Sequence, residues 1–354
     1  MFASLKRSLT GLFKSLRVRV ARSVRRARGA GAGRWVDGNH REARGSLAFA
    51  PMIAPYRAYR LYLPSHYHAE ESLPLLVMLH GCHQDPESFA AGTRMNAVAD
   101  RERLLVLYPE QRKLANNNRC WNWFDPTTHG GGGEAAIITG MVRAVMAQYG
   151  VDTTRIWVAG LSAGGAMASI LASCHAELFA ACAVHSGLMF QAAASPGAAK
   201  RAMERGSDRE PRRAGREALE ISGKTVDAMP VIVIHGARDE QVNPVNADQV
   251  VLQFAALNRF AEAESTAVEA MPGKKRSDTS AGGYRYEIRD YRRADRLLIR
   301  QVTVDELGHA WSGGDPRYAH NDPRGPDATA LIWDFLRLYR RSPKLLKTPI
   351  PADA

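Results

Sequence analysis

One serine of this chain lies between glycines, at the point where a strand-like run of residues gives way to a helix-like run. Residues 160–164 (GLSAG) fit the pattern G-x-S-x-G around Ser162. Residues 154–160 (TRIWVAG) predict the strand, and residues 163–173 (AGGAMASILAS) predict the helix. A sharp strand-to-helix turn holds its serine in strained backbone angles and needs small neighbours. The pattern therefore predicts a nucleophilic serine, the alternative being a glycine-rich loop that merely contains one.

A serine hydroxyl is a weak nucleophile unless a base takes its proton, and that base needs an acid to orient it. In enzymes built on such a turn, the acid and then a histidine follow the serine along the chain. Asp239 comes just after the buried strand predicted within residues 229–240, where the loops of an open α/β sheet gather. His309 lies on a glycine-flanked loop after the last predicted strand. The order Ser162, Asp239, His309 predicts a catalytic triad, the alternative for Asp239 being an ordinary turn aspartate.

Three other histidines are weaker candidates for the base. His235 shares a strand-end segment with Asp239 and is predicted to be structural. His185 ends a strand, where it could line the cleft. His175 follows the helix after the serine and is predicted to lie on the surface.

The competing acids are also less suitable. Asp248 falls within a helical pattern, which predicts a solvated side chain on the helix surface. Asp305 and Glu306 lie so close to His309 in the sequence that neither is its usual partner. Asp239 is therefore the acid that the sequence favours.

Stabilising the oxyanion that develops when the serine attacks takes preorganised backbone N–H groups. One is expected from Ala163, which follows the serine at the start of the predicted helix. The second usually comes from the loop after the third strand of the sheet, here residues 79–89 (LHGCHQDPESF). Position alone assigns this second donor to Cys82, whose alternative roles are a small packing residue or half of a disulfide.

Strand-like and helix-like segments alternate through the body of the chain, which predicts an α/β fold with a mostly parallel sheet and helices on both faces. Strands are expected within residues 56–64, 73–81, 104–110, 154–160, 179–187, 229–240, 284–291 and 296–309, the first of them antiparallel. Helices are expected over residues 86–103, 133–150, 163–173, 246–260 and 327–341. The polar, arginine-rich stretch 191–228 breaks this rhythm and is expected to be a lid or a surface insertion. The domain is placed at residues 46–342, before a C-terminal tail of residues 343–354.

The net charge of +12 is concentrated at the N-terminus. Residues 1–36 contain ten lysines and arginines and no acid, so the rest of the chain is close to neutral. A near-neutral body argues against a nucleic-acid-binding face on the main domain, and no nucleic-acid partner is expected. No stretch approaches the roughly 18 uninterrupted apolar residues of a membrane span.

The N-terminal tail, residues 1–45, spaces its first apolar residues at steps of three and four. This pattern predicts a basic amphipathic helix that could dock on an anionic membrane or another apolar, anionic surface. The alternative is a disordered basic arm. Basic residues interrupt every apolar run of the tail, so no secretory signal peptide is expected.

The cysteines Cys82, Cys120, Cys174 and Cys182 show no C-x-x-C spacing, which argues against a zinc or thioredoxin-type site. They are too few for a disulfide scaffold, although they allow one bridge. The serine chemistry needs no metal ion and no organic cofactor, so neither is expected.

Several further motifs accompany the serine turn. The stretches LHGCHQ, YPEQ, CWNWFDP, GLSAGG, AVHSG, VIVIHGARDEQV and GHAWSGG together resemble the polyhydroxybutyrate depolymerase-type esterase family of α/β-hydrolases, over residues 57–340. GCHQ, CWNW and GHAWSGG are more specific than the serine motif, which all such hydrolases share. Feruloyl and acetylxylan esterases are similar near relatives.

The resemblance implies an α/β-hydrolase fold and a serine esterase that acts on poly- or oligo(3-hydroxybutyrate)-type esters. It gives triad roles to Ser162, Asp239 and His309, and places Cys82 and Ala163 at the oxyanion hole. The alternatives are a feruloyl or acetylxylan esterase, another α/β-hydrolase such as a peptidase, and a non-catalytic surface-binding protein. A polyester granule would then be a second surface on which the tail could dock.

The resemblance also places Trp121, Trp123 and Trp311 near the cleft, where aromatic walls suit apolar acyl or aryl groups. Their alternative role is to anchor the core or the loops. Cys82 and Cys120 flank segments that the resemblance brings together at the site, so a disulfide between them is expected unless a cytosolic location keeps them reduced.

Secreted polymer-degrading members are expected to carry a signal peptide, a linker and a separate substrate-binding domain. None of these is expected in this chain, so a cytoplasmic location, free or on a membrane or granule surface, is favoured over the extracellular alternative. The sequence leaves the natural ester and the oligomeric state open.

Overall fold

The chain folds around one large sheet in a computed structural model that describes residues 33–42, 56–222, 227–260, 268 and 271–342. The strands of this sheet are β1 (Arg34–Arg41), β2 (Tyr56–Leu63), β3 (Leu73–Leu79), β4 (Leu105–Pro109), β5 (Val151–Leu161), β6 (Ala181–His185), β7 (Val231–Gly236), β8 (Lys274–Thr279), β9 (Arg285–Arg293) and β10 (Arg296–Val304). A separate short pair consists of β11 (Trp311–Ser312) and β12 (Asn321–Asp322). The helices are α1 (Pro86–Thr93), α2 (Met95–Glu102), α3 (Pro126–His129), α4 (Gly133–Gln148), α5 (Ala163–Cys174), α6 (Pro196–Arg205), α7 (Pro211–Ile221), α8 (Val245–Leu257) and α9 (Ala328–Leu336).

The strand order is β1-β2-β4-β3-β5-β6-β7-β10-β9-β8. The six central strands, from β4 to β10 in that order, are all parallel to their neighbours. The two strands at each edge pair antiparallel. The predicted mostly parallel sheet and the predicted antiparallel strand at residues 56–64 are therefore confirmed.

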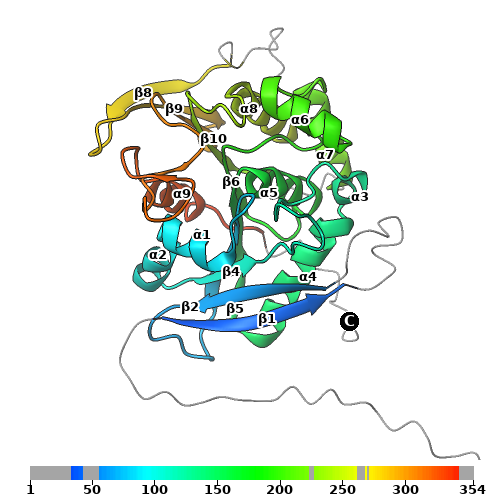
Figure 1. Cartoon of the computed structure of the whole chain (residues 1–354), viewed down its shortest axis with the longest axis vertical. Coiled ribbons are helices and arrows are strands. Elements are labelled where there is room, and N and C mark those ends of the chain that lie inside the picture. Colours follow the sequence, from blue (N-terminus) through cyan, green and yellow to red (C-terminus); the bar gives the residue numbers. More distant parts are fainter. Residues whose placement is uncertain (1–32, 43–55, 223–226, 261–267, 269–270, 343–354) are drawn as a thin grey trace, which may run out of the picture. The chain divides into compact units, whose positions relative to one another are not determined.

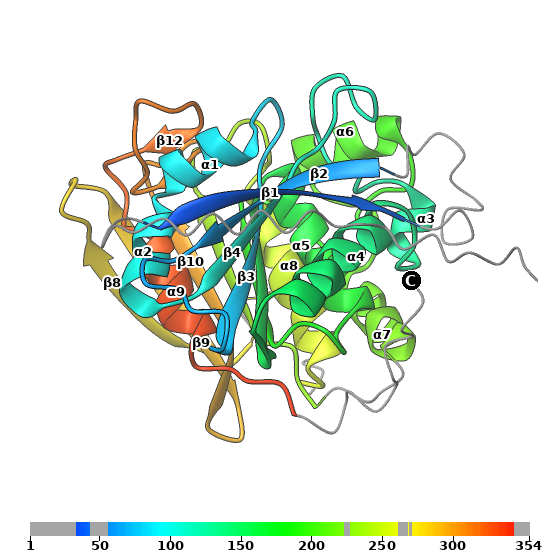
Figure 2. The same ribbon diagram turned by 90° about the horizontal axis from the view of Figure 1, so that it is seen from below.

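Helices cover both faces of the sheet (Figures 1 and 2). Figure 2 shows α4, α5 and α8 on one face, and α1, α2 and α9 on the other. Successive residues of a strand point to opposite faces, so on β3 Leu75 and Val77 join the first hydrophobic layer while Leu76 and Met78 join the second. The uninterrupted apolar runs in the sequence follow from this arrangement, because both faces of the central strands are buried.

Residues 34–41, which the sequence analysis assigned to the tail, form the edge strand β1. All eight of its residues pair with β2, from Arg34 opposite Leu63 to Arg41 opposite Tyr56. The strand is half exposed along its length and holds a glycine at position 38. Because the strand is half exposed, its sequence lacks the apolar alternation that predicts a strand. The predicted boundary of the N-terminal tail at residue 45 is therefore wrong.

The single helix predicted over residues 86–103 is divided into α1 and α2. Asp85 caps α1 by accepting the backbone N–H of Ser88, and Arg94 ends it in the left-handed region at φ 57°. The Arg94 side chain reaches the loop after β11, where its Nη2 donates to the Gly313 carbonyl at 2.5 Å. This contact links the break to a distant segment, which local helical periodicity cannot reveal.

The 191–228 excursion contains α6 and α7, with residues 223–226 outside the described part. Ser195 caps α6 and Glu210 caps α7, and each helix begins with a proline. α7 packs along α8 through a small-residue contact, because a Cβ on Gly215 would lie 2.1 Å from the Gln253 carbonyl oxygen. The excursion is thus a packed helical insertion in its described part.

Two further predictions fall on residues outside the described ranges. Residues 1–32 contain the predicted amphipathic helix, and residues 343–354 the predicted C-terminal tail. The docking of the N-terminal tail on a membrane or granule therefore stays a prediction.

Candidate active site

Ser162 occupies the turn between β5 and α5. Its backbone has φ 57° and ψ −122°, a conformation that costs energy for a residue with a side chain. The neighbouring glycines permit very close packing: a Cβ on Gly160 would lie 2.2 Å from the Gly164 carbonyl oxygen. A Cβ on Gly164 would lie 2.1 Å from the carbonyl oxygen of Leu79 on β3. The turn therefore requires glycine on both sides of the serine.

Asp239 and His309 form a hydrogen-bonded pair in the loops that follow β7 and β10. His309 Nδ1 lies 2.8 Å from Asp239 Oδ2, and Asp239 Oδ1 accepts the backbone N–H groups of Gln241 and Val242 at 3.0 and 2.8 Å. Burial alone would raise the pKa of Asp239, but hydrogen bonds from His235 and His309 outweigh it and hold this pKa well below its ordinary value. Asp239 is therefore ionised at neutral pH and keeps a proton on His309 Nδ1.

Ser162 and His309 line the same cavity, which has a volume of about 200 Å³. The other residues of its wall are Gly81, Cys82, His83, Gln84, Cys120, Leu161, Met203, Gln241 and His320. Within the described ranges, no hydrogen bond joins the Ser162 side chain to His309. Such catalytic contacts are often loose before substrate binds. The fold thus brings Ser162, Asp239 and His309 to one place.

The two predicted oxyanion donors lie beside Ser162. Ala163 is the first residue of α5, where a backbone N–H has no partner inside the helix. Cys82 lines the cavity with Ser162, and in the part of the chain that the structure describes its N–H donates to no acceptor. Gly81 comes close to the serine, since a Cβ built on it would lie 3.5 Å from Ser162 Cβ. Both N–H groups are therefore available to an oxyanion.

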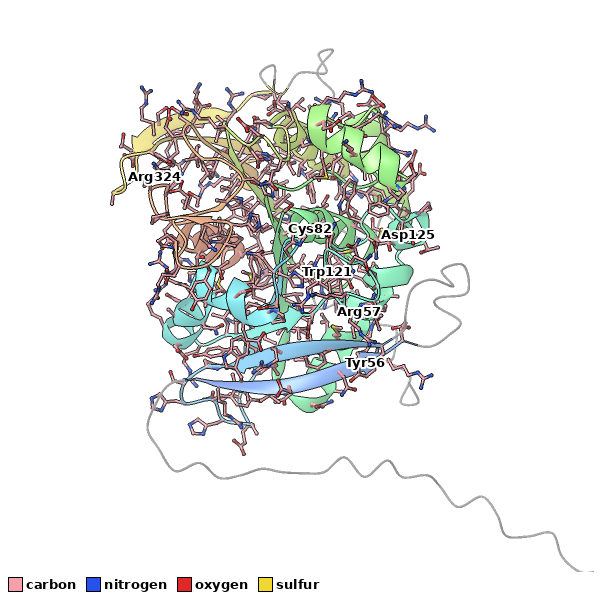
Figure 3. The ribbon with its side chains drawn as sticks, in the orientation of Figure 1. Tyr56, Arg57, Cys82, Trp121, Asp125 and Arg324 are labelled. Carbon is pink, nitrogen blue, oxygen red and sulfur yellow. A yellow bond between two sulfur atoms is a disulfide. The ribbon has the colours of Figure 1, made fainter. Side chains whose placement is uncertain are left out.

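A disulfide joins Cys82 to Cys120, with a Cα–Cα distance of 4.2 Å (Figure 3). A second link lies next to it, where the His83 N–H donates to the Asn118 carbonyl at 2.7 Å. The oxyanion loop after β3 is thus tied at two neighbouring points to the loop between β4 and α3.

The loop between β4 and α3 is held in turn by a buried ion pair that the sequence analysis missed. Arg57 Nη2 lies 2.9 Å from Glu134 Oε1, and neither side chain is exposed (Figure 3). The same oxygen accepts Gln111 Nε2 at 2.6 Å, and Glu134 Oε2 accepts the Asn122 N–H at 2.7 Å. Glu134 therefore connects β2, α4 and both ends of the loop that carries Cys120.

We expect Glu134→Gln to lower the free energy of unfolding by about 3 kcal/mol, because it removes the buried carboxylate that pairs with the Arg57 guanidinium. Urea denaturation measures this change. Glu204→Gln is the matched control: Glu204 pairs with Lys200 on the surface of α6, with 58% of its side chain exposed. An exposed pair contributes at most about 1 kcal/mol, so equal effects of the two substitutions would contradict the role given to Glu134.

His185 does not line the cavity. Its Nε2 accepts the Ser312 N–H at 3.1 Å, and its ring stacks on Trp311 with centroids 5.1 Å apart. Burial, and then the nearby His235 and His309, lower the pKa of His185 to about 3. His185 is therefore a neutral buried histidine that supports the segment just after His309.

The remaining candidates also have structural partners. His235 Nε2 lies 2.8 Å from a backbone carbonyl of the Asp239 loop, in keeping with the structural role predicted for it. His175 is more buried than predicted, because its Nε2 contacts the Gly131 carbonyl at 3.0 Å. Asp248 is partly buried and accepts Gln301 Nε2 at 2.7 Å. The two acids beside His309 in the sequence are exposed, Asp305 and Glu306.

The three tryptophans do not form walls of the cavity. Trp121, Trp123 and Trp311 are all buried, and none is among the lining residues. Trp121 Nε1 donates to the His80 carbonyl at 3.1 Å, and Trp311 Nε1 to Thr329 Oγ1 at 3.0 Å. The predicted role in substrate binding is therefore wrong for this cavity, and the three rings are packed in the hydrophobic core instead.

Five residues of the cavity wall were not expected from the sequence: His83, Gln84, Met203, Gln241 and His320. Three of them could have been found from the sequence. His83 and Gln84 belong to the GCHQ motif, and Gln241 follows Asp239 by two positions. Met203 comes from α6, so the insertion contributes to the site. Nothing in the local sequence marks Met203 or His320.

Within the described residues, no group of three or more histidines, cysteines, aspartates or glutamates could hold a metal ion. The described helices include none with both the length and the apolar character needed to cross a membrane.

Comparison with known proteins shows that this chain is similar to esterases. Residues 57–278 match the family model described as Esterase PHB depolymerase. Poly(3-hydroxyalkanoate) depolymerase C from Paucimonas lemoignei is 31% identical over 239 residues, which is 67% of this chain and 54% of that protein. Feruloyl esterase B from Neurospora crassa is 31% identical over 189 residues, covering 51% of this chain and 64% of that protein. The chain thus spans between about half and two thirds of the length of these curated relatives.

Solved structures show the same fold. The acetyl xylan esterase from Aspergillus awamori superposes with a TM-score of 0.60 at 20% identity, over 72% of this chain and 89% of that chain. A feruloyl esterase module from Clostridium thermocellum gives a TM-score of 0.52 at 13% identity, over 87% and 88%. Likeness at these identities concerns the fold alone, and it confirms the predicted α/β-hydrolase architecture.

Proposed function

Because this chain belongs to the Esterase PHB depolymerase family, we propose that it is a serine esterase that cleaves carboxylic esters through an acyl-enzyme. The observation that carries this proposal is the hydrogen-bonded pair of His309 and Asp239 beside the cavity that Ser162 also lines. The strained turn at Ser162 supports the same chemistry, as do the N–H groups of Cys82 and Ala163, which have no acceptor among the described residues.

In the first half of the reaction, Ser162 Oγ attacks the ester carbonyl carbon while His309 Nε2 takes the hydroxyl proton. The N–H groups of Cys82 and Ala163 donate to the oxyanion of the tetrahedral intermediate. The ester C–O bond then breaks, and His309 gives its proton to the departing alkoxide. Asp239 stabilises the positive charge that His309 carries between these two proton transfers.

In the second half, a water molecule attacks the acyl group on Ser162. His309 takes a proton from this water, and the same N–H groups stabilise the second oxyanion. The bond to Ser162 Oγ breaks, the serine recovers its proton from His309, and the carboxylic acid leaves. The chain's own residues therefore supply every proton transfer of the cycle.

For the substrate we propose esters of short, polar acyl groups, with 3-hydroxybutyrate-type esters first and acetyl esters second. A cavity of about 200 Å³ is small for an aromatic acyl group. Its wall includes polar side chains such as His83, Gln241 and His320, and no tryptophan. These features favour a short acyl group over the feruloyl group, and the depolymerase relative supports a hydroxyalkanoate.

A panel of esters tests this proposal on the purified full chain. The expected kcat/KM for ethyl 3-hydroxybutyrate, the 3-hydroxybutyrate dimer and ethyl acetate exceeds that for methyl ferulate by about tenfold or more. A preference for methyl ferulate would overturn the substrate class. Failure to hydrolyse any of these esters would overturn the esterase itself and favour a non-catalytic binding protein.

A further inference from the structure

His320 lies beside His309 but takes no part in the acyl-enzyme chemistry described above. The two rings have centroids 6.1 Å apart and meet edge-on at 78°. His320 lines the same cavity as Ser162. It is therefore placed to touch a bound ester, although it is neither the nucleophile nor its base.

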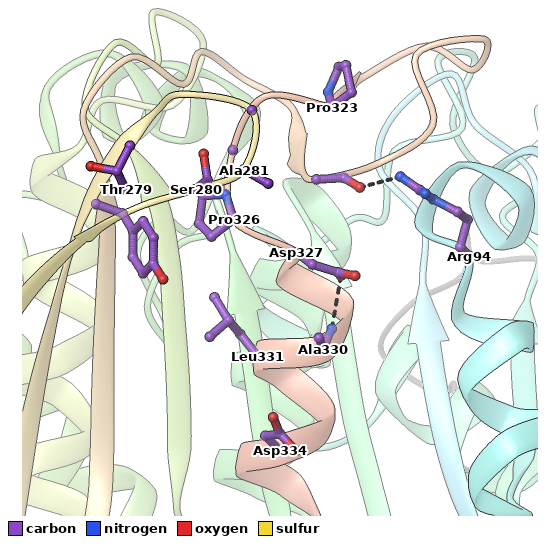
Figure 4. A pocket seen from close by; sticks show the side chains of 14 residues that line it. Arg94, Thr279, Ser280, Ala281, Pro323, Pro326, Asp327, Ala330, Leu331 and Asp334 are labelled. Atoms are coloured by element: carbon purple, nitrogen blue, oxygen red, sulfur yellow. Dashed lines mark hydrogen bonds between the residues drawn. The ribbon is translucent and has the colours of Figure 1, made fainter.

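The backbone holds His320 firmly at this position. Its carbonyl accepts the Trp311 N–H at 2.8 Å, next to the pairing of β11 with β12. The loop between β11 and α9 also lines a second, more open cavity (Figure 4), where Arg94 Nη2 donates to the Gly313 carbonyl. The loop that presents His320 is thus anchored at several points.

The His320 ring offers an acceptor. Burial, then the nearby His309, lower the pKa of His320, and a backbone hydrogen bond with His309 only partly offsets them. The ring is therefore neutral at neutral pH, with one nitrogen protonated and the other an acceptor. This acceptor nitrogen can take a hydrogen bond from a donor in the cavity.

Within the described part of the chain, no side chain donates a hydrogen bond to the His320 ring. Among the described residues that line the cavity, none is a lysine or an arginine. Gln84 lies nearby, but its Nε2 donates to the Ala319 carbonyl at 3.2 Å and its Oε1 accepts the Gly81 N–H at 2.8 Å. A ligand hydroxyl is the natural donor for a half-buried neutral imidazole nitrogen.

We propose that His320 accepts a hydrogen bond from a hydroxyl group of the substrate, and thereby makes the enzyme selective for hydroxylated esters. This inference rests on the proposed esterase function and adds to it a specificity residue. The hydroxyl could belong to the acyl group, as in a 3-hydroxyalkanoate, or to the alcohol, as in a polyol ester. The shared chemistry is one hydroxyl near the scissile ester bond.

Three esters separate these sources: ethyl butyrate, ethyl 3-hydroxybutyrate and 2-hydroxyethyl butyrate. The measured quantity is the ratio of kcat/KM for each hydroxylated ester to that for ethyl butyrate. In His320→Phe we expect this ratio to fall about tenfold or more for one hydroxylated ester, the size expected for one lost hydrogen bond in a half-buried site. His320→Gln, which keeps an acceptor, should recover part of the ratio and serves as the second variant should the first not fold.

His66→Phe is the matched control, since His66 has the same φ of 59° as His320 but is exposed and outside the cavity wall. Its ratios should equal those of the unmodified enzyme. An equal loss on all three esters in His320→Phe would show that His320 only positions His309, and unchanged ratios would show no role; either result overturns the inference. Absence of activity in the unmodified enzyme would instead overturn the proposed function.

Discussion

Ser162→Ala is expected to lower kcat for ethyl butyrate by about 10⁴-fold or more, to the level that binding and the oxyanion donors sustain without a nucleophile. The substitution removes one oxygen at a position of φ 57°. The fold should be retained, and the melting temperature checks this. Steady-state kinetics on the purified variant measures the loss.

The control for this variant is Ser169→Ala, on the same helix α5. Ser169 is buried and its Oγ contacts Gln253 at 3.1 Å, away from the cavity wall. Its loss should change kcat by less than about threefold. A Ser162→Ala enzyme that keeps a tenth or more of the original kcat would exclude Ser162 as the nucleophile.

Asp239→Asn is expected to lower kcat by about 10³- to 10⁴-fold at neutral pH. The amide keeps the shape of the side chain, and its oxygen can still accept the backbone N–H groups of Gln241 and Val242. It cannot stabilise the positive charge that His309 acquires, and its NH₂ group favours the wrong tautomer of His309. KM should change little, because the interaction lost belongs to the transition state.

Asp305→Asn tests whether this loss is specific. Asp305 lies four positions before His309 but is exposed, 3.9 Å from Arg285. Its replacement should leave kcat within about twofold. If the two substitutions had equal effects, Asp239 would not be the acid of a triad.

The low pKa of Asp239 bears on how the activity and the stability of the protein depend on pH. Because its pKa is depressed in the folded protein, Asp239 stays ionised as the pH falls through the ordinary aspartate range. Any loss of activity in mildly acidic solution therefore does not arise from protonation of Asp239. The contribution of this group to stability is complete above the ordinary aspartate pKa and is lost only as the pH falls toward the depressed value.

Local sequence was enough to predict the central sheet and the residues at its carboxyl ends. A strand buried on both faces must be apolar throughout, as β3 and β7 are. The serine turn requires glycines at fixed positions. Ser162, Asp239 and His309 each follow such a strand or lie on the loop beyond it, so topology alone brings them together.

The features of the fold that were not predicted from the sequence depend on contacts between distant segments. β1 is half exposed and pairs only with β2, so its sequence carries no strand pattern. At the break between α1 and α2, the Arg94 side chain contacts the carbonyl of Gly313, which lies 219 positions away. The tryptophans near the site motifs proved to be packing residues because apolar rings serve equally well in a core and in a cleft.

Within the site, too, some residues could not be predicted because their positions depend on contacts between distant segments. Glu134 and Arg57 are separated by 77 positions, and no local pattern distinguishes a buried ion pair from two solvated charges. His320 reaches the cavity only because β11 and β12 pair and return its loop to His309. Residues of this kind can be found only once the fold is known.

Whether Ser162 is the nucleophile is tested most directly by covalent labelling. The purified full chain is treated with diisopropyl fluorophosphate and the adduct is located by peptide mass spectrometry. We expect a single adduct on Ser162, absent from Ser162→Ala and formed far more slowly in His309→Ala, together with loss of ester hydrolysis. Ester hydrolysis that persists without an adduct, or an adduct on another residue that abolishes it, would contradict the proposed mechanism.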